Sequence, residues 1–325
     1  MRLTTSEKME LIRLVEQSDW SVRRTLKELG IHKSTFYSWY KQYREQGIEG
    51  LKPKKAKRKQ YWNKIPEQIR AGIIDFALDT PELSCRELAC KYTDEQHYYI
   101  SESSVYRILK KAGLINPPQH DLIQAADKFK DQTRKVNEMW QTDFTYFKIL
   151  GWGWYYLSTV LDDYSRFIIS WELCPTMKAG DVKSTLNQAL NHPNVSLENP
   201  PKLLSDNGSA YLSKELGAYL HKFKIQHVRG RPLHPQTQGK IERYHRTMKN
   251  VVKLENYYSP DQLKYRLKEF VDYYNYQRYH ESLDNLTPAD VYYGKKDYRL
   301  AKRRKCKILT MQKRKQEYIR KSLKV

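Results

Sequence analysis

The sequence of 325 residues has few cysteines, no long apolar run and no excess of acidic charge. Its four cysteines (Cys85, Cys90, Cys174 and Cys306) show no paired spacing, so neither a disulfide framework nor a Cys-x-x-Cys zinc site is indicated. We expect reduced, buried thiols. No stretch approaches the ~20 apolar residues of a membrane-spanning helix, and the amino terminus lacks the apolar core of a signal peptide. These absences exclude a membrane protein and predict a cytoplasmic one.

Positive charge is what the sequence has in excess. It contains 59 Lys and Arg against 37 Asp and Glu, a net charge of +22. A chain with this charge repels itself unless it binds a polyanion, and nucleic acid is the usual one. Residues 52–64 hold seven basic residues and no acid, residues 295–325 hold fourteen against two acids, and residues 136–255 hold fifteen against eleven. The middle is therefore predicted to be a folded domain, and the flanks to bind DNA.

Residues 1–50 have the pattern of three short helices, which is typical of a helix-turn-helix DNA-binding domain. Ser6 is expected to cap the first helix and Ser21 the second, and Gly30 turns the chain into the third, near residues 33–44. The third helix would bury Phe36, Trp39 and Tyr40 and present to a major groove Lys33, Ser34, Thr35, Tyr37, Ser38 and Lys41. A bundle that binds protein is the alternative, but the basic segment that follows favours DNA.

That basic segment, residues 51–64, is predicted to be a linker that lies along phosphates. Its candidate DNA contacts are Lys54, Lys55, Lys57, Arg58 and Lys59. Residues 65–118 repeat the three-helix pattern, with helices expected at 67–78, 84–91 and 101–113. The aromatic residues between 92 and 100 suggest a hairpin or an extended loop, which leaves a winged helix-turn-helix open. A second linker is expected at 119–135.

From Trp140 the pattern changes from helices to strands. Asp143 lies in the strand 140–146 among residues that favour strands, where a carboxylate is unfavourable unless it has a function. Another short, buried strand is expected to begin at Lys202 and to end in Asp206. The remaining expected elements are strands at 155–161, 167–173 and 225–229, and helices at 181–190, 213–223 and from near Gln238. Together they predict an α/β domain.

The helix that begins near Gln238 is amphipathic. An apolar stripe is formed by Ile241, Tyr244, Met248 and Val252, while the other face presents Glu242, Arg246 and Lys249. Open α/β sheets hold their sites where strands end, so Asp143, Asp206 and Glu242 are expected to converge there. Three carboxylates repel one another unless divalent cations lie among them, and oxygen ligands favour Mg²⁺ or Mn²⁺.

These acids and their surroundings resemble a known family. Asp143 in WQTDFTY, Asp206 in SDNGSAY and Glu242 in HPQTQGKIERYHRTMK, with 35 residues between the last two, are similar to the DDE triad of bacterial insertion-sequence transposases with a retroviral-integrase-like catalytic core. The resemblance covers about residues 136–294, including the segment YNYQRYHESLDNLTPADVYYG at 274–294.

The resemblance implies a multidomain fold: all-α helix-turn-helix modules, a ribonuclease-H-like α/β core at 136–258, a helical extension at 259–294 and a basic tail at 295–325. It implies a DDE-type polynucleotidyl transferase that uses two Mg²⁺ or Mn²⁺ ions, held by the three acids, to cleave transposon terminal inverted repeats and to join the 3′-OH to target DNA. Double-stranded DNA and a homo-oligomer, a dimer or higher, assembled on paired ends are the implied partners, at the nucleoid of a bacterium.

The same resemblance assigns DNA contacts near the acids. Lys249 matches the basic position that contacts transposon-end DNA in this family, and Arg246, Arg243 and Asn207 are further candidates. The His and Cys zinc set of retroviral integrases is not visible at the amino end, so recognition of the ends is not expected to depend on zinc. Whether the tail after Gly294 is helical or ordered only on DNA stays open.

Two other functions stay under consideration: a catalytically silent DNA-binding regulator descended from a transposase, and a stand-alone nuclease of the same fold. Intact acids at all three positions disfavour the regulator, and the paired DNA-binding modules disfavour the nuclease. Tyrosine or serine recombinase chemistry is disfavoured because no nucleophile lies in a basic cluster. Among single residues, Asp162 and Asp163 are expected to cap a turn, His234 and His245 to contact DNA or pack, and the tyrosines at 273–279 to pack in the core.

Overall fold

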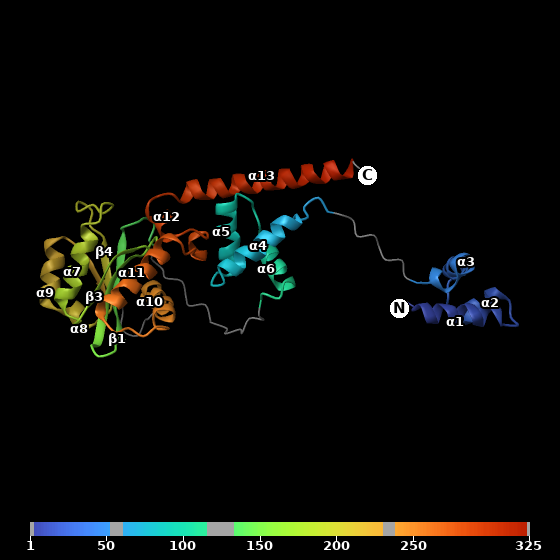
Figure 1. The fold of residues 1–325 in the computed structure, drawn as a ribbon, viewed down its shortest axis with the longest axis horizontal. Coiled ribbons are helices and arrows are strands. Elements are labelled where there is room, and N and C mark those ends of the chain that lie inside the picture. The colour runs from blue at the N-terminus through green and yellow to red at the C-terminus, as the bar shows by residue number, and fades with distance from the viewer. Residues whose placement is uncertain (1–2, 53–60, 116–132, 230–237, 324–325) are drawn as a thin grey trace. The chain divides into compact units, whose positions relative to one another are not determined.

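The computed structural model of the chain describes residues 3–52, 61–115, 133–229 and 238–323 (Figure 1). Its contacts divide the chain into two units, residues 1–61 and 62–325. In these described ranges, no helix is long and apolar enough to cross a membrane. Most of each expected linker lies outside the described residues, as do His234 and the candidate DNA contacts Lys54, Lys55, Lys57, Arg58 and Lys59.

The first unit contains three helices, α1 (Thr5–Glu16), α2 (Val22–Glu28) and α3 (Lys33–Gly50). Its core is formed by Ile12, Val15, Leu26, Phe36 and Leu51. The expectation that Ser6 caps α1 is wrong. Thr4 is the cap, because its hydroxyl accepts a hydrogen bond from the Glu7 N–H while the Glu7 carboxylate accepts one from the Thr4 N–H.

Helix α3 presents the surface that the sequence predicts. Phe36 is buried, and Trp39 and Tyr40 are partly buried beside it. The exposed positions include Lys33, Ser34, Thr35, Tyr37, Ser38 and Lys41. Near the end of the helix Gly47 has a φ of +62°, a conformation that glycine adopts without strain, and the resulting kink precedes the buried Leu51.

The second unit begins with another three-helix module, formed by α4 (Glu67–Asp79), α5 (Cys85–Gln96) and α6 (Glu102–Lys111). The prediction of a hairpin or extended loop at 92–100 is wrong for its first half, because α5 continues to Gln96, and no strand is described between α5 and α6. Tyr92 follows Leu88 by one helical turn, so both pack in the core of this module and the buried stripe of α5 continues.

A five-stranded sheet follows, with the order β3-β2-β1-β4-β5. The strands are β1 (Met139–Ile149), β2 (Gly153–Asp162), β3 (Ile168–Cys174), β4 (Lys202–Ser205) and β5 (His227–Arg229). The first three pair in an antiparallel meander, whereas β4 runs parallel to β1 and β5 parallel to β4. The central strand β1 therefore has β4 as a neighbour only along its first residues, Met139 to Gln141.

Helices cover both faces of the sheet (Figure 1). One core contains side chains of α7 (Ala179–Leu190), α8 (Ser209–Leu212) and α9 (Lys214–Lys222) together with Trp140, Val160 and Leu203. The other contains side chains of α10 (Gly239–Val252) and α11 (Pro260–Tyr276) together with Phe147, Ile149 and Leu157. The apolar stripe predicted for α10 is confirmed, since Ile241, Tyr244, Met248 and Val252 are all buried. The tyrosines near 273–279 are mixed: Tyr274 is buried in the core, whereas Tyr276 is 53% exposed.

The carboxyl-terminal part is helical. After α11 come the 3-10 turn η2 (Glu281–Leu283), α12 (Pro288–Tyr292) and the long helix α13 (Lys296–Ser322), drawn in red in Figure 1. The basic tail, whose structure the sequence left open, is thus one continuous helix over residues 296–322.

Helix α13 is joined to the second helical module through a shielded ion pair. The Arg303 guanidinium donates to both carboxylate oxygens of Asp94, at 2.8 and 2.6 Å, and the two side chains are only 15% and 14% exposed. The Tyr279 hydroxyl donates to the same carboxylate at 3.0 Å, and Arg303 also donates to the Asn285 carbonyl at 2.8 Å. Asp94 therefore joins α5 to α13 and to the segment that follows α11.

The cysteines form no disulfide. Cys174 is buried, and burial raises the pKa of its thiol to about 12, whereas Cys85, Cys90 and Cys306 are only partly buried. The expectation of buried thiols is therefore correct for Cys174 alone.

The edge strand β3 is held by one side chain of α11. The Asn275 amide oxygen accepts a hydrogen bond from the Ile168 N–H at 2.9 Å, and its amide nitrogen donates to the Ile168 carbonyl at 3.0 Å. Asn275 is buried, so it provides the partners that another strand would otherwise supply.

Replacing Asn275 by alanine is expected to lower the free energy of unfolding by about 2–4 kcal/mol, because two buried backbone groups lose their partners. Urea denaturation followed by circular dichroism measures the change. Gln277→Ala, at an exposed position two residues later, is the matched control and should change the free energy by less than about 0.5 kcal/mol. Equal effects of the two substitutions would contradict this role of Asn275.

Candidate functional site

Asp143 lies in the middle of the central strand. Side chains alternate along β1, so Asp143 shares a face with Phe147 and Ile149, the face that α10 and α11 cover. Its carboxylate is 22% exposed, and one oxygen accepts a hydrogen bond from the Phe144 N–H at 2.8 Å. The other oxygen lies 3.4 Å from Nδ1 of the buried His245. One oxygen is thus fixed by backbone, and the other faces an imidazole.

Asp206 follows the last residue of β4. The parallel register pairs Gln141 with Leu204, and two further residues along each strand bring Asp206 level with Asp143. The Asp206 side chain accepts a hydrogen bond from the Gly208 N–H at 3.0 Å, as in the tight turns that Asp favours. A Cβ atom at position 208 would lie only 3.0 Å from the Asp206 carboxylate, so glycine leaves the space in which that carboxylate sits.

Tyr211 lies within electrostatic reach of both aspartates. Its side chain is buried and its hydroxyl lies 3.4 Å from the Thr142 hydroxyl. Burial raises the pKa of Tyr211 well above its ordinary value, and the negative charges of Asp143 and Asp206 raise it further. Both carboxylates therefore act on the same hydroxyl.

Glu242 lies in the first turn of α10, on the exposed face of the helix. Burial raises the pKa of Glu242, and the charge of Asp143 raises it further, while Arg246 and His245 act in the opposite direction. The third acid is thus within electrostatic reach of the first. Mutual destabilisation of this kind is what a divalent cation would relieve.

In the part of the chain that the structure describes, no three His, Cys, Asp or Glu residues are gathered closely enough to hold a metal ion. The three acids nevertheless fit a hard cation in their chemistry. They offer carboxylate oxygens alone, and the charge of Asp143 disfavours ionisation of Glu242 as well as of Tyr211.

The start of α10 is fastened to β1 by residues that the sequence analysis did not single out. The Gln141 side-chain oxygen accepts a hydrogen bond from the Ile241 N–H at 3.0 Å, and its amide nitrogen donates to Asp163 at 2.7 Å. The Lys240 ammonium donates both to the Asp163 carboxylate and to its carbonyl, each at 2.7 Å. Because Glu242 follows Lys240 by two residues, this network sets where Glu242 lies.

Asp162 has the turn role that the sequence predicts, and Asp163 does not. The Asp162 carboxylate accepts hydrogen bonds from the Ser165 N–H, the Ser165 hydroxyl and the Asn137 N–H. Burial raises its pKa to about 6 although those hydrogen bonds act to lower it. Asp163 is instead the anion of the network that binds Lys240. No local pattern in the sequence marks this pair, because Lys240 and Asp163 lie 77 positions apart.

The candidate DNA contacts of the α/β domain do not all face the acids. The Lys249 ammonium lies 4.6 Å from the centroid of the Tyr146 ring, and burial lowers the pKa of Lys249. Arg246 is close enough to act on Glu242, whereas Arg243 acts on Arg166 and Tyr274. Asn207 is exposed in the turn after Asp206.

The candidate contacts of the first unit lie together on α3. Lys33 is 5.9 Å from the centroid of the Tyr37 ring, Ser34 is hydrogen-bonded to His32 at 2.8 Å, and Lys41 pairs with Glu45 at 3.9 Å. Thr35 is exposed on the same helix. These are weak surface interactions, which leave the side chains available to another partner.

Known families match most of the chain. A model described as an integrase core domain matches residues 133–235, and a second model with the same description matches residues 223–288. A helix-turn-helix domain matches residues 7–59, and a homeodomain-like domain matches residues 35–109. Residues 133–288 are thus similar to integrase core domains. The resemblance to transposases with such a core and the predicted order of helical modules, α/β core and helical carboxyl-terminal region are therefore confirmed.

Curated relatives of the integrase core include a bacterial and a viral protein. The chain is 26% identical to the transposase for transposon Tn552 of Staphylococcus aureus over 277 residues, which cover 76% of this chain and 56% of that protein. It is 33% identical to the Gag-Pro-Pol polyprotein of squirrel monkey retrovirus over 116 residues, which cover 36% of this chain and 6% of the polyprotein. The chain thus spans only part of the length of the relatives that it matches.

Solved structures of integrases also match. The catalytic core domain of HTLV-2 integrase, solved in complex with magnesium, is 22% identical and has a TM-score of 0.38, with 49% of this chain and 97% of that chain covered. The simian T-cell lymphotropic virus intasome is 21% identical with a TM-score of 0.43, with 63% and 74% covered.

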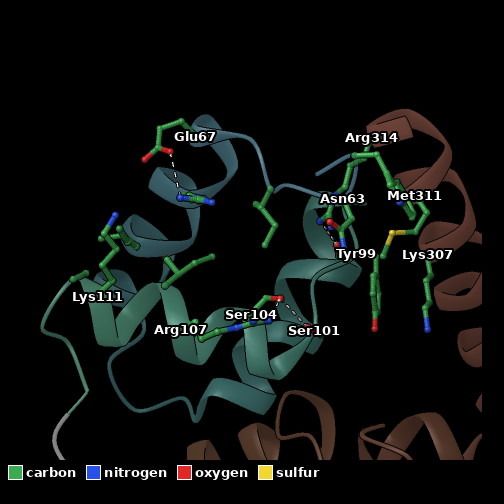
Figure 2. Close-up of a pocket in the computed structure, with 16 residues that line it drawn as sticks. Asn63, Glu67, Tyr99, Ser101, Ser104, Arg107, Lys111, Lys307, Met311 and Arg314 are labelled. Atoms are coloured by element: carbon green, nitrogen blue, oxygen red, sulfur yellow. Dashed lines mark hydrogen bonds and ion pairs between the residues drawn. The ribbon is translucent and has the colours of Figure 1, made fainter. Parts of the chain in front are cut away.

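A cavity of about 850 Å³ lies outside the integrase core, between α4, α6 and α13. Figure 2 shows Ser101 and Ser104 at the start of α6 on one side and Lys307, Met311 and Arg314 on the other. Its charged lining residues are Glu67, Arg70, Arg107, Lys111, Lys307 and Arg314. The Arg314 guanidinium donates to the Tyr98 hydroxyl and the Tyr99 carbonyl. Five of the six charged lining residues are basic, and the lining extends along the whole of α6.

Replacing Lys240 by methionine is expected to destabilise the integrase core by about 3 kcal/mol, because Asp163, only 5% exposed, would keep a charge without its cation. Thermal and urea denaturation at pH 7 measure the effect. Lys268→Met, at an exposed position of α11, is the control.

The double variant Lys240→Met with Asp163→Asn tests the cause. It should recover much of the stability that Lys240→Met alone loses, since no buried charge is left unpaired. A double variant that is less stable than the single variant would show that the ion pair is not what fastens α10.

Proposed function

We propose that the chain is a DNA transposase, which binds transposon terminal inverted repeats, cleaves the ends and joins them to target DNA. The observation that carries this proposal is the placement of Asp143, Asp206 and Glu242. Two aspartates lie level on neighbouring parallel strands. Glu242 lies on α10, which covers the face of the sheet that carries Asp143, and burial together with the charge of Asp143 raises the pKa of Glu242. The integrase core and the helix-turn-helix modules support the same function.

Asp143, Asp206 and Glu242 would hold Mg²⁺ or Mn²⁺, two ions in each site. Such cations, when bound, polarise the scissile phosphate and make water or a sugar hydroxyl a better nucleophile. The relative HTLV-2 integrase core was solved in complex with magnesium.

The protein's own contribution is to orient these carboxylates. The Phe144 N–H and His245 restrict the rotation of the Asp143 side chain, and the Gly208 N–H restricts that of Asp206. The network of Gln141, Asp163 and Lys240 fixes the turn that carries Glu242. Preorganised groups of this kind lower the reorganisation that in-line phosphoryl transfer requires.

Two consecutive transfers would then use one site. In the first, water attacks the phosphodiester at the transposon end, the 3′ oxygen leaves and takes up a proton, and a free 3′-OH results. In the second, that 3′-OH attacks a phosphodiester of target DNA, and the target's own 3′ oxygen leaves. Each step replaces one P–O bond by another, so no covalent intermediate with the protein is required.

DNA would be bound by several parts of the chain. The exposed face of α3 and the start of α6 are suited to a major groove, and the basic residues 52–64 to phosphates. Beside the acids, Lys249, Arg246 and Asn207 would contact the transposon end. Because two ends must be joined in one event, the active form would be a homo-oligomer, a dimer or higher.

Asp206→Asn and Glu242→Gln are each expected to lower metal-dependent nicking and strand transfer on order of 10³-fold, because each removes a charged oxygen ligand. The assay uses inverted-repeat DNA from the element's flanks with Mg²⁺ or Mn²⁺. Asp272→Asn, at an exposed position of α11, is the control for loss of an acid. Binding of the ends, measured by gel shift, should persist in all three variants.

Two results would favour the other candidate functions. Tight binding of the ends with no nicking by the unaltered protein under either metal would favour a silent regulator. Nicking without joined products, and without preference for the ends, would favour a stand-alone nuclease.

A further inference from the structure

The outer part of the β1–β2 hairpin carries exposed aromatic rings. Tyr146 and Trp154 are each 51% exposed, and their rings meet edge to face with centroids 5.4 Å apart. The register pairs Tyr146 with Tyr156 and Lys148 with Trp154, so all four side chains lie on one face of the hairpin. Large aromatic side chains that are half exposed and adjacent are typical of binding surfaces.

Cations surround these rings. The Lys249 and Lys253 ammonium groups lie 4.6 and 5.8 Å from the centroid of the Tyr146 ring, and both come from α10. Lys148 lies directly opposite Trp154 on the neighbouring strand. We call Tyr146, Trp154, Lys249 and Lys253 the hairpin platform.

The hairpin platform begins next to the three acids. Tyr146 follows Asp143 by three residues on β1, so the two side chains point to opposite faces of the sheet. Phe144, on the same face as Tyr146, packs against Tyr211, whose pKa is raised by burial and by the charges of Asp143 and Asp206. The charge of Asp143 also acts on Lys249. Lys249 belongs to α10, which packs on the face of the sheet that carries Asp143, and its ammonium reaches the Tyr146 ring. A strand held at the acids therefore shares Lys249 with the platform, whose rings lie on the other face of β1, about 10 Å further along the strand.

We propose that the hairpin platform binds unpaired bases of single-stranded DNA beside the acids, with the rings stacking on bases and the lysines binding phosphates. This inference rests on the proposed function, because it gives the site a DNA strand to hold. Aromatic rings between cations are the pattern of sequence-tolerant binding of single strands. A site of this kind would hold the strand next to the reacting phosphate after the duplex end has opened.

Two other occupants fit less well. Double-stranded DNA keeps its base faces stacked inside the helix, so it would use the lysines but leave the rings without a partner. A second copy of the chain would have to bury several lysines, and the cores of protein interfaces are depleted of that residue. Unpaired bases use both the rings and the charges.

Photo-crosslinking tests where the bases lie. The probe is a 12-nucleotide oligothymidine that carries one 5-iodouracil, irradiated on the full chain and mapped by mass spectrometry. Crosslinks at Tyr146 or Trp154 are expected, because this base reacts with aromatic rings that it contacts. Crosslinks found only elsewhere on the chain would overturn the proposal.

Affinity tests whether stacking contributes. At one salt concentration, the ratio of affinities for oligothymidine and for an abasic 12-mer of equal charge should fall about 5- to 100-fold in Trp154→Ala. Trp154→Phe, which keeps a ring, should retain most of the ratio. Tyr265→Ala, which removes a 66% exposed ring from α11, should leave it unchanged.

The outcomes separate this proposal from the proposed function. An unchanged ratio in Trp154→Ala would overturn the platform even if the unaltered protein nicks and joins DNA. If Trp154→Ala loses the ratio but the unaltered protein does not nick DNA, the proposal of the platform stands and the proposed transposase function is wrong. If Trp154→Ala changes the oligomeric state in size-exclusion chromatography but not the ratio, the surface is an interface between copies and the proposal is wrong.

Discussion

The attachment of the first turn of α10 to β1 is the constraint on which the rest of the site depends. A glutamate at a helix start is exposed, and nothing in its own turn fixes its direction. Here the Ile241 N–H, one of the orphan donors of that turn, is bound by Gln141, two residues before Asp143. The side chain that accepts a hydrogen bond from the first turn of α10 therefore belongs to β1, the strand that carries Asp143. This single hydrogen bond positions Glu242 relative to Asp143.

The attachment of α10 to β1 also explains why the buried ion pair of Lys240 and Asp163 lies beside three carboxylates of like charge. Asp163 adds a fourth carboxylate to the region, but its oxygens are taken up by Gln141, Thr133 and Lys240. Its charge is thus neutralised locally and is not among those that act on Glu242. Among the described residues, Asp143 and Asp206 have fewer protein donors, which leaves oxygen lone pairs for a cation and for substrate.

Much of the fold could be predicted from the sequence because its signals are local. The stripe of Ile241, Tyr244, Met248 and Val252 repeats at helical spacing, and Asp143 and Asp206 interrupt or follow a run of strand-forming residues. The capping of α1 and the length of α5 were predicted wrongly. Residue type alone favours Ser6 over Thr4 as a cap, and Tyr92 suits a strand as well as a buried helix face. The network of Gln141, Asp163 and Lys240 has no sequence spacing that predicts it. The order of the three acids in the chain also does not determine whether they come close enough to bind one metal ion.

The pairing of Asp94 with Arg303 spans 209 positions of the sequence, and it has no local signature at all. This pairing limits how the second helical module can be exchanged between related proteins. One carboxylate of the second helical module accepts hydrogen bonds from α13 and from Tyr279, so the module's partners lie 185 and 209 positions further along the chain. Replacing residues 62–115 by another helix-turn-helix module would remove Asp94 and leave Arg303 without its anionic partner. The two segments would therefore have to be inherited, or engineered, as a matched pair.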